Sequence, residues 1–403
     1  MAEVKKNSIK DVVKAINKNC KDWDILGAGD LSRNVKKLSL HALGFDLALR
    51  GGLPYGQIAS ISGVEYSGKS TLATIIMAQY QRENPDKVCI YVDAENTLLT
   101  QSDYFQSITG ISYAPEHFLR YDCTGRSAEE IFQDLIELQC TDEIGLIVVD
   151  SARALISQAD LDNDFVKDNG QRASIAKSLG KFMKQMLMYL PKKNNMLVVL
   201  NQVTVLKDMF STTYTEPCGY ALKYYPSVKF RLATRTFTCK SKDDISQGKA
   251  DSTVDGLQIH FAITKSRIGG INKEGGFITI RYATGVDSAF DFYKVAMAGD
   301  FIKNNTLADL ETGEIYKDEE TGKELVFSGE KALQNYLAAH PNIVEMMSKM
   351  IIRHVAKNKS SVSLLDNEFL NEILNQEKEL CPIEMTPAEA LIADGVEGVA
   401  VSE

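Results

Sequence analysis

One stretch of this chain has the residue types and spacing of a phosphate-binding loop. Residues 63–70 match the pattern G-x-x-x-x-G-K-[ST], after an apolar run and before a helical pattern. Glycines let the backbone curl so that successive N–H groups point at phosphate oxygens, and the following helix N-terminus adds its positive end. We expect Lys69 to reach the terminal phosphates of a nucleotide and the Ser70 hydroxyl to bind Mg²⁺. The predicted phosphate-binding set is Gly63, Val64, Glu65, Tyr66, Ser67, Gly68, Lys69, Ser70 and Thr71.

Two carboxylates follow other predicted strands and would complete a site for nucleotide hydrolysis. Asp150 ends the apolar run 146–149, and beside the phosphate loop it could hold Mg²⁺ through water. Glu95 lies just past the predicted strand 88–92, where a carboxylate can orient and deprotonate an attacking water. The alternative for Glu95 is a carboxylate that only stabilises a helix N-terminus.

An amide pair, Asn201-Gln202, follows a further strand. An amide at a strand end can donate a hydrogen bond to a γ-phosphate and so distinguish ATP from ADP. Taken alone, the pair would be interpreted as a structural turn.

Apolar strands and helices alternate between these motifs and must position them. The predicted strands are 58–62, 88–92, 144–149 and 196–200, and the predicted helices are 70–81, 128–139 and 174–189. This alternation predicts an α/β fold with a mostly parallel sheet and helices on both faces. Further strands at 228–234, 257–265 and 277–282 lack long helices between them and predict an antiparallel extension. From Asp291 onward the chain is predicted to be mainly helical, with a turn-rich interruption at 310–326.

The composition excludes several classes of protein. With 403 residues, 44% hydrophobic and 25% charged, the chain is predicted to be globular, with two or three folding units. The net charge of −9 disfavours a generally basic nucleic-acid coat, so any DNA binding must be local. No apolar run approaches the ~20 residues that span a bilayer, and no apolar segment follows the lysine-rich N-terminus. The seven cysteines lack C-x-x-C spacing, which favours a reduced, intracellular compartment and argues against a zinc site.

The two ends of the chain carry opposite charge. Residues 1–21 hold six lysines against Glu3 and Asp11, and residues 381–403 hold five acidic residues and no lysine or arginine. The first segment is predicted to form a short helix whose apolar stripe packs on its own core or on a neighbouring subunit. That stripe comprises Ile9, Val12, Val13 and Ile16. The last segment is predicted to be an acidic, mobile tail.

In combination, these motifs resemble the core of the bacterial RecA recombinase family. The segments that carry the resemblance are GGLPYGQIASISGVEYSGKST (51–71), IYVDAEN (90–96), LIVVDS (146–151), LNQ (200–202), ALKYYPSVKFRL (221–232) and KSRIGG (265–270). The similarity runs from about residue 37 to residue 282, and residues 329–354 resemble the family's C-terminal domain. Phage recombinases of the UvsX type share the core, but the chain looks closer to bacterial RecA. The resemblance implies a RecA-like P-loop ATPase core with a short N-terminal helix and a small α/β C-terminal domain.

The resemblance also implies roles for single residues. Glu95 would be the catalytic glutamate, and Gln202 would sense the γ-phosphate. Tyr104 would stack on adenine, whereas Lys265 and Arg267 would reach into the neighbouring subunit's ATP, so that hydrolysis depends on assembly. The alternative for the last pair is an exposed basic strand end.

DNA is expected at two loops, near 158–172 and 203–219. The window 151–223 has ten Lys and Arg against six Asp and Glu, a local net charge of +4 in an acidic chain. The predicted DNA-binding residues are Phe165, Val166, Arg172, Lys177, Leu206, Lys207, Met209, Phe210, Gly219 and Tyr220. For the apolar members, burial in the core is the alternative. This chain departs from the family at Thr204, Cys218 and Tyr220, where the family has an arginine, a glycine and a small amide.

The implied protein is an ATP- and Mg²⁺-dependent recombinase with four segments. These are 1–36 (polymerisation helix and linker), 37–290 (ATPase core with two DNA-binding loops), 291–380 (C-terminal domain) and 381–403 (acidic tail). It would form a helical filament of identical subunits on single-stranded DNA and exchange strands with homologous duplex DNA in the cytoplasm, without a membrane partner. Lys223 and Tyr224 are assigned to the subunit interface. A ring helicase and an ATP-binding repair regulator without strand exchange remain the alternatives.

Overall fold

The chain divides into two compact units, Met1–Lys36 and Lys37–Glu403. The computed structural model describes residues 35–162, 173–207, 212–215, 219–237, 256–268, 275–282, 284–318 and 321–358. The predicted N-terminal stripe and the acidic tail therefore lie outside the described residues. The elements and contacts of the second unit carry the predicted site.

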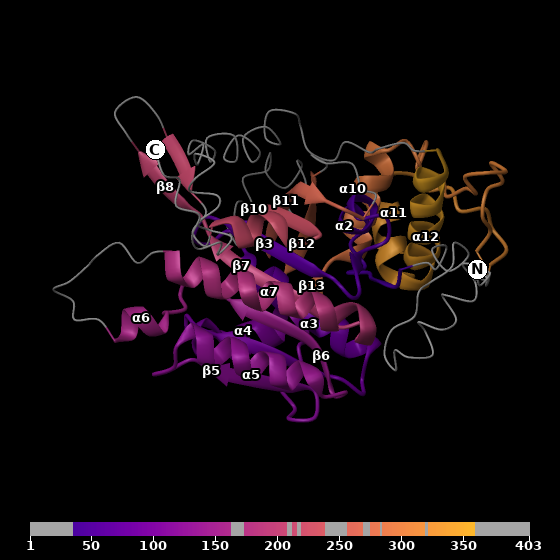
Figure 1. The fold of residues 1–403 in the computed structure, drawn as a ribbon. Coiled ribbons are helices and arrows are strands. Elements are labelled where there is room, and N and C mark those ends of the chain that lie inside the picture. The colour runs from indigo at the N-terminus through magenta and orange to yellow at the C-terminus, as the bar shows by residue number, and fades with distance from the viewer. Residues whose placement is uncertain are drawn as a thin grey trace, which may run out of the picture. The chain divides into compact units, whose positions relative to one another are not determined.

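A nine-stranded sheet forms the centre of this unit, with the order β13-β12-β11-β10-β3-β7-β6-β4-β5 (Figure 1). Six neighbouring strands are parallel: β10 (Val228–Phe237), β3 (Ile58–Gly63), β7 (Met196–Gln202), β6 (Ile144–Asp150), β4 (Val88–Asp93) and β5 (Phe118–Asp122). The remaining strands, β11 (Gly256–Ser266), β12 (Gly275–Arg281) and β13 (Gly285–Val286), continue from β10 in antiparallel pairs. The predicted parallel sheet and its antiparallel extension are both confirmed.

Helices cover both faces of the sheet, because alternate residues of the buried strands point to opposite sides. On one face, Val148 and Val198 pack with α3 (Lys69–Glu83) and α4 (Thr97–Thr109). On the other face, Val149 and Val199 pack with α5 (Ala128–Cys140) and α7 (Ala173–Lys193). These two helices meet through the stacked rings of Phe132 and Phe182, whose centroids are 4.6 Å apart.

The second predicted DNA loop contains regular structure. Strands β8 (Thr204–Lys207) and β9 (Thr212–Thr215) pair antiparallel as a hairpin, and α8 (Gly219–Tyr224) follows. Threonine, valine and tyrosine favour strands, and this composition explains why the segment is not an open loop. The first loop keeps only the short helix α6 (Gln158–Leu161) among its described residues.

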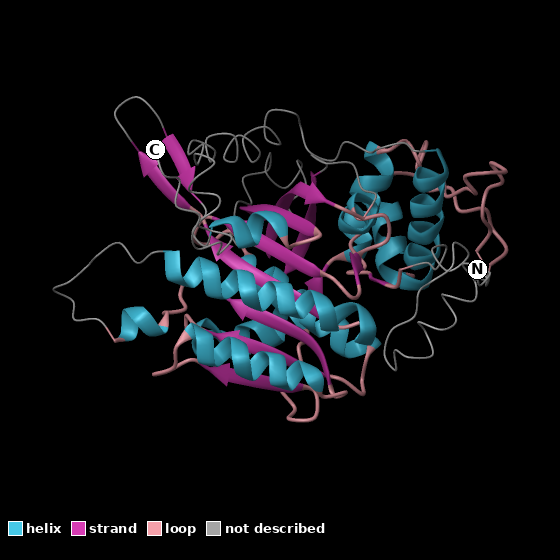
Figure 2. Ribbon diagram, in the orientation of Figure 1, coloured by secondary structure: helices cyan, strands magenta, loops and turns pink. Residues whose placement is uncertain are grey.

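The C-terminal part is helical and has its own apolar cluster (Figure 2). Helices α10 (Ser288–Ala298), α11 (Glu330–Ala339) and α12 (Pro341–Asn358) pack with Leu43 and Leu47 of α2 (Leu43–Ala48). Between α10 and α11, isolated bridges such as Ala308–Ile315 and Lys317–Glu324 form the turn-rich interruption. The predicted boundary between residues 290 and 291 falls inside α10, whose N-cap is Asp287. The division into domains stays a prediction.

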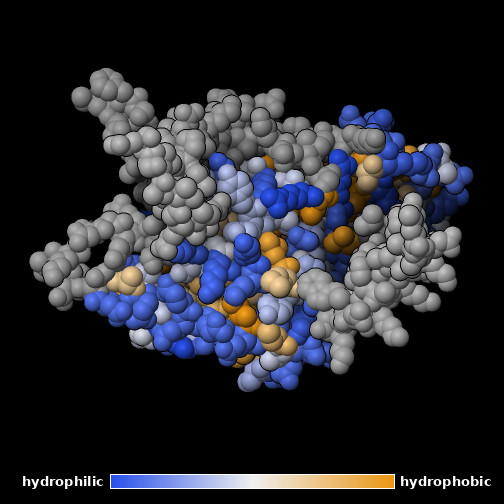
Figure 3. Space-filling view, in the orientation of Figure 1, coloured by the Kyte–Doolittle hydropathy of each residue, from blue (hydrophilic) through white to orange (hydrophobic). Residues whose placement is uncertain are grey.

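The short pair β1 (Lys37–Leu38) and β2 (Leu53–Pro54) begins the unit. The coloured part of the face seen in Figure 3 is mostly hydrophilic, with smaller hydrophobic areas between the hydrophilic ones. Within the described residues, no helix has the length and apolar composition needed to cross a membrane.

Candidate active site

The phosphate loop joins β3 to α3, as the sequence predicts. Gly63 has no room for a side chain, because a Cβ there would collide with the Ser67 hydroxyl and lie 3.0 Å from the Leu232 carbonyl oxygen. Gly68 has a φ of 83°, a left-handed conformation that glycine adopts without steric cost, and it directly precedes α3. Lys69 Nζ donates to the Val64 carbonyl oxygen at 2.8 Å, so the lysine bonds to its own loop. Burial lowers the pKa of Lys69, and this effect is opposed by Asp150.

The remaining loop positions differ in exposure. Ser67 and Thr71 are buried, whereas Glu65 is exposed and Val64 is half-buried. Tyr66 is 87% exposed, so its ring extends away from the core.

Asp150 lies at the end of β6 and is held by two hydroxyl groups. Ser70 Oγ donates to its Oδ2 at 2.7 Å, and Tyr91 Oη, from β4, donates to the same oxygen. Burial raises the pKa of Asp150, and the two hydrogen bonds oppose that shift. Hydroxyl and carboxylate oxygens are the hard donors that Mg²⁺ prefers, so the adjacent Ser70 and Asp150 fit the predicted metal.

Glu95 lies between β4 and α4 and contacts two other strand ends. Ser151 Oγ, directly after β6, donates to Glu95 Oε1. Gln202 Nε2, at the end of β7, lies 3.0 Å from Glu95 Oε1 and 3.1 Å from Oε2. Glu95 and Gln202 are therefore joined directly, and Ser151 is the third member of the group.

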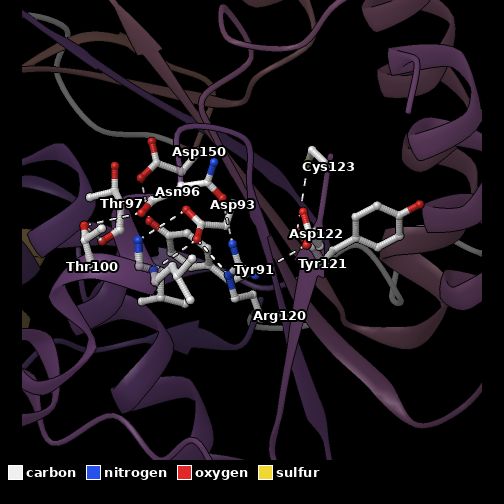
Figure 4. Close-up of polar contacts among 12 residues, drawn as sticks. Tyr91, Asp93, Asn96, Thr97, Thr100, Arg120, Tyr121, Asp122, Cys123 and Asp150 are labelled. Carbon is white, nitrogen blue, oxygen red and sulfur yellow. Dashed lines mark hydrogen bonds and ion pairs between the residues drawn. The ribbon is translucent and has the colours of Figure 1, made fainter. Parts of the chain in front are cut away.

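The backbone that carries Glu95 is held by an ion pair, shown in Figure 4. Arg120 Nε, from β5, lies 2.8 Å from Asp93 Oδ2. Arg120 Nη2 donates to Asn96 Oδ1 at 2.9 Å. The Ala94 N–H also donates to the Asp150 carbonyl oxygen at 2.8 Å, which ties the Glu95 segment to the end of β6.

Sequence reasoning missed Tyr91, Ser151 and Arg120. Both Tyr91 and Ser151 stand inside the quoted segments. Ser151 directly follows Asp150 at a strand end, and its hydroxyl was a usable signal, whereas Tyr91 lies inside β4. Arg120 had no local signal, because its partners Asp93 and Asn96 are more than twenty positions away in the chain.

Tyr104 lies on α4, 38% exposed, with its ring centroid 6.5 Å from that of Tyr282. Burial raises its pKa. Both rings are partly exposed to solvent, and neither residue belongs to the phosphate loop. The stacking of Tyr104 on adenine stays a prediction.

Lys265 lies near the end of β11, and Arg267 directly follows that strand. Lys265 Nζ donates to the carbonyl oxygens of Lys223 and Tyr224 at 2.7 and 2.8 Å. Burial, and then the positive charges of Arg267 and Lys229, lower the pKa of Lys265 to about 8. Arg267 is exposed, and its backbone N–H donates to the carbonyl oxygen of residue 227. The bonds of Lys265 thus join this basic pair to the assigned interface residues of α8.

The predicted DNA residues are placed only in part. Phe165, Val166, Arg172, Met209 and Phe210 lie outside the described residues, as do Ile9, Val12, Val13 and Ile16 of the predicted interface. Leu206 and Lys207 pair in β8 opposite Thr213 and Thr212, and Gly219 begins α8.

Two further members of this set are exposed. Lys177 is exposed on α7, and Tyr220 is 45% exposed on α8. The rings of Tyr220 and Tyr224 are stacked with centroids 5.7 Å apart, so a residue assigned to DNA touches one assigned to the interface.

Part of the positive charge of the window 151–223 lies away from the edge of the sheet formed by the carboxyl ends of its parallel strands. Lys193, at the C-terminal end of α7, is 3.0 Å from Asp142, just before β6 begins. This lysine therefore does not contribute to a DNA surface at the strands' carboxyl ends.

Comparisons with known proteins agree with these features. A family model described as the RecA N-terminal domain matches residues 7–287. Proteins named Protein RecA from Streptococcus pneumoniae strains Hungary19A-6 and CGSP14 are each 27% identical to this chain over 371 residues. The aligned region covers 91% of this chain and 87% of each relative.

Proposed function

Because this chain belongs to the RecA family, we propose that it is a recombinase that hydrolyses ATP on single-stranded DNA and exchanges strands with homologous duplex. Family membership supports a recombinase-type ATPase that uses ATP with Mg²⁺. Filament formation, homology search and strand exchange are the finer part of the proposal. A cytoplasmic location belongs to it as well.

The observation that carries the proposal is the contact between Glu95 and Gln202. Glu95 follows β4 and Gln202 ends β7, and their side chains meet at 3.0 and 3.1 Å. A carboxylate that activates water and an amide that senses a phosphate need to face the same reacting group. Lys69, Ser70 and Asp150 belong to the same edge of the sheet, where strands β3 and β6 end.

Each side chain has a role in the proposed hydrolysis. Bound Mg²⁺ would supply charge neutralisation on the phosphates, held by Ser70 and, through water, by Asp150. Glu95 accepts a proton from the attacking water as the oxygen bonds to the γ-phosphorus and the bond to the β-phosphate oxygen breaks. Lys69 neutralises charge on the terminal phosphates, and its bond to the Val64 carbonyl oxygen uses one of the three donors of its ammonium group.

Gln202 would link the nucleotide to DNA. When a γ-phosphate is present, its amide can donate to a phosphate oxygen instead of to Glu95. Gln202 ends β7, and Thr204 begins the hairpin β8–β9 two positions later. A shift of the Gln202 side chain would therefore be transmitted to the segment assigned to DNA.

Lys265, Arg267, Lys223 and Tyr224 are proposed to act between subunits. Basic side chains from a neighbour would stabilise the negative charge that develops on the phosphates. This makes hydrolysis dependent on the filament, as the proposed function requires.

Electron microscopy with single-stranded DNA and a non-hydrolysable ATP analogue tests the proposal. We expect helical filaments with both ligands, and ATP hydrolysis that rises when single-stranded DNA is added. A ring helicase would instead form closed rings and unwind a forked duplex. Hydrolysis that is equally fast without DNA, in a protein that stays monomeric with both ligands, would contradict the proposal.

A further inference from the structure

Arg120 bonds to both residues that flank the Ala94-Glu95 dipeptide. It comes from β5, the strand at the end of the sheet, and lies opposite Tyr91 in the β4–β5 pairing. Its Nε bonds to Asp93 Oδ2 at 2.8 Å, and its Nη2 bonds to Asn96 Oδ1 at 2.9 Å (Figure 4). A planar guanidinium can make these two bonds at once because its donors form a rigid fork.

Asp93 needs this partner because its carboxylate is buried. Its side chain is 0% exposed, and a buried charge without a partner is strongly unfavourable. Besides Arg120, it accepts the N–H groups of Leu98 and Leu99, each at 3.2 Å. These are early N–H groups of α4, which receives no capping bond from the side chain of its own N-cap residue, Asn96. The Arg120–Asp93 pair thus fixes the start of the helix that follows Glu95.

Asn96, on the C-terminal side of Ala94-Glu95, is held by the same arginine. Its φ is 55°, in the left-handed region that asparagine tolerates better than most residues. Its side chain oxygen is used by Arg120 and not by the helix. The residues on both sides of Ala94-Glu95 are therefore held by one guanidinium.

We propose that Arg120 is a positioning residue that holds the Glu95 segment in the geometry needed for ATP hydrolysis. Arg120 acts through Asp93 and Asn96 and has no described contact with Glu95 itself. The catalytic consequence rests on the proposed function, whereas the holding of the segment does not. Because a small displacement of a reacting group costs about 10²-fold in rate, loss of the fork should lower turnover more than nucleotide binding.

The test compares Arg120→Met with Arg120→Lys and Arg126→Met in the full chain. Methionine keeps a long stem without donors, whereas lysine offers one point charge for two acceptors. Arg126 is the matched control: it lies on the connection after β5, and its Nη1 is 2.6 Å from Asp134 Oδ2, but its described contacts do not include the Glu95 segment. DNA-stimulated kcat, KM for ATP and amide hydrogen exchange of residues 94–99 are measured for each.

For Arg120→Met we expect kcat to fall about 10- to 100-fold with KM changed less than about twofold, and faster exchange in 94–99. Arg120→Lys should recover part of kcat, and Arg126→Met should match the wild type. A folded Arg120→Met protein with wild-type kcat and exchange would overturn the inference. Equal losses in both methionine variants, or a loss of ATP binding as large as the loss of kcat, would overturn it too.

The exchange measurement separates this inference from the proposed function. If the wild type does not hydrolyse ATP on DNA, the proposed function fails and hydrogen exchange alone decides. Faster exchange of 94–99 in Arg120→Met but not in Arg126→Met then supports the holding role, and unchanged exchange overturns it.

Discussion

Buried carboxylates at the carboxyl edge of the sheet and in the C-terminal helical cluster have different partners. At the edge, Asp150 accepts bonds from the hydroxyls of Ser70 and Tyr91, and Asp93 forms an ion pair with Arg120. In the C-terminal cluster, the described bonds to the carboxyl group of Asp291 come from Thr279, whose N–H lies 3.2 and 3.0 Å from the two carboxyl oxygens. Burial raises the pKa of Asp291 to about 8.

The two kinds of partner indicate two different roles for a buried carboxyl group: one in the proposed hydrolysis and one in holding elements of the fold together. The partners of the carboxylates at the edge come from helix α3 and from strands β4 and β5, which join several elements at the proposed site of hydrolysis. Asp291 instead joins α10 to β12, and a protonated carboxyl serves that purpose at neutral pH. Changes at the edge should therefore alter turnover, and changes in the cluster should alter stability.

The largest effect is expected for Glu95→Gln. This change keeps the size of the side chain but removes the base, so DNA-stimulated kcat should fall by about 10²- to 10⁴-fold. Thermal unfolding should change little, because the amide can still bond to Ser151. The measurement is steady-state ATP hydrolysis with single-stranded DNA, with the exposed Glu116→Gln as control. Wild-type turnover in Glu95→Gln would show that Glu95 is not the base. It would also contradict the distinction between the carboxyl edge of the sheet and the C-terminal cluster.

The next effect is expected in the C-terminal cluster. Phe292 is 0% exposed on α10, and its replacement by alanine should lower the free energy of unfolding by about 3–5 kcal/mol. Urea unfolding measures this change, and Met297→Ala, at a 37% exposed position of the same helix, is the matched control. The kcat of the protein that remains folded should stay near the wild-type value. A large fall in kcat without loss of stability would show that the two regions are not separable in this way.

The smallest effect concerns pH. In the unfolded chain Asp291 titrates near 3.8, and in the native protein its pKa is about 8, because burial disfavours the charged form. Between these values the native state keeps a proton that the unfolded state has released, so this group's contribution to stability falls as the pH rises from about 4 to about 8. An amide at this position would carry no such proton.

The Asp291→Asn variant should therefore lose less stability than the wild type between pH 5 and pH 6.5. The difference should be about 1.4 kcal/mol for each pH unit over which the native carboxyl keeps its proton. Thermal unfolding at both pH values measures this, and the exposed Asp300→Asn is the control. Parallel pH profiles for wild type and Asp291→Asn would show that the carboxyl is not protonated in the native protein.

Much of the fold could be predicted because its strands are continuous apolar runs. Strands such as β6 are buried throughout, and that pattern is visible in the sequence. Strand β5 was not predicted, because it lies at the end of the sheet and only Tyr121 among its residues is buried. The hairpin β8–β9 was interpreted as loop, since its strands are only four residues long.

The sequence by itself determined the phosphate loop. Its glycines, Lys69 and Ser70 lie within eight consecutive positions, so the covalent chain alone keeps them close together. Tertiary structure decided that Glu95, Ser151 and Gln202 meet. Their strands are ordered β7-β6-β4, so that the residue after β6 stands between the other two. It also decided that Arg120 lies beside Asp93, since only the pairing of β5 with β4 brings these distant positions together. Strand order depends on how the whole chain covers both faces of the sheet, and the apolar pattern of a single strand does not specify which strands lie beside it.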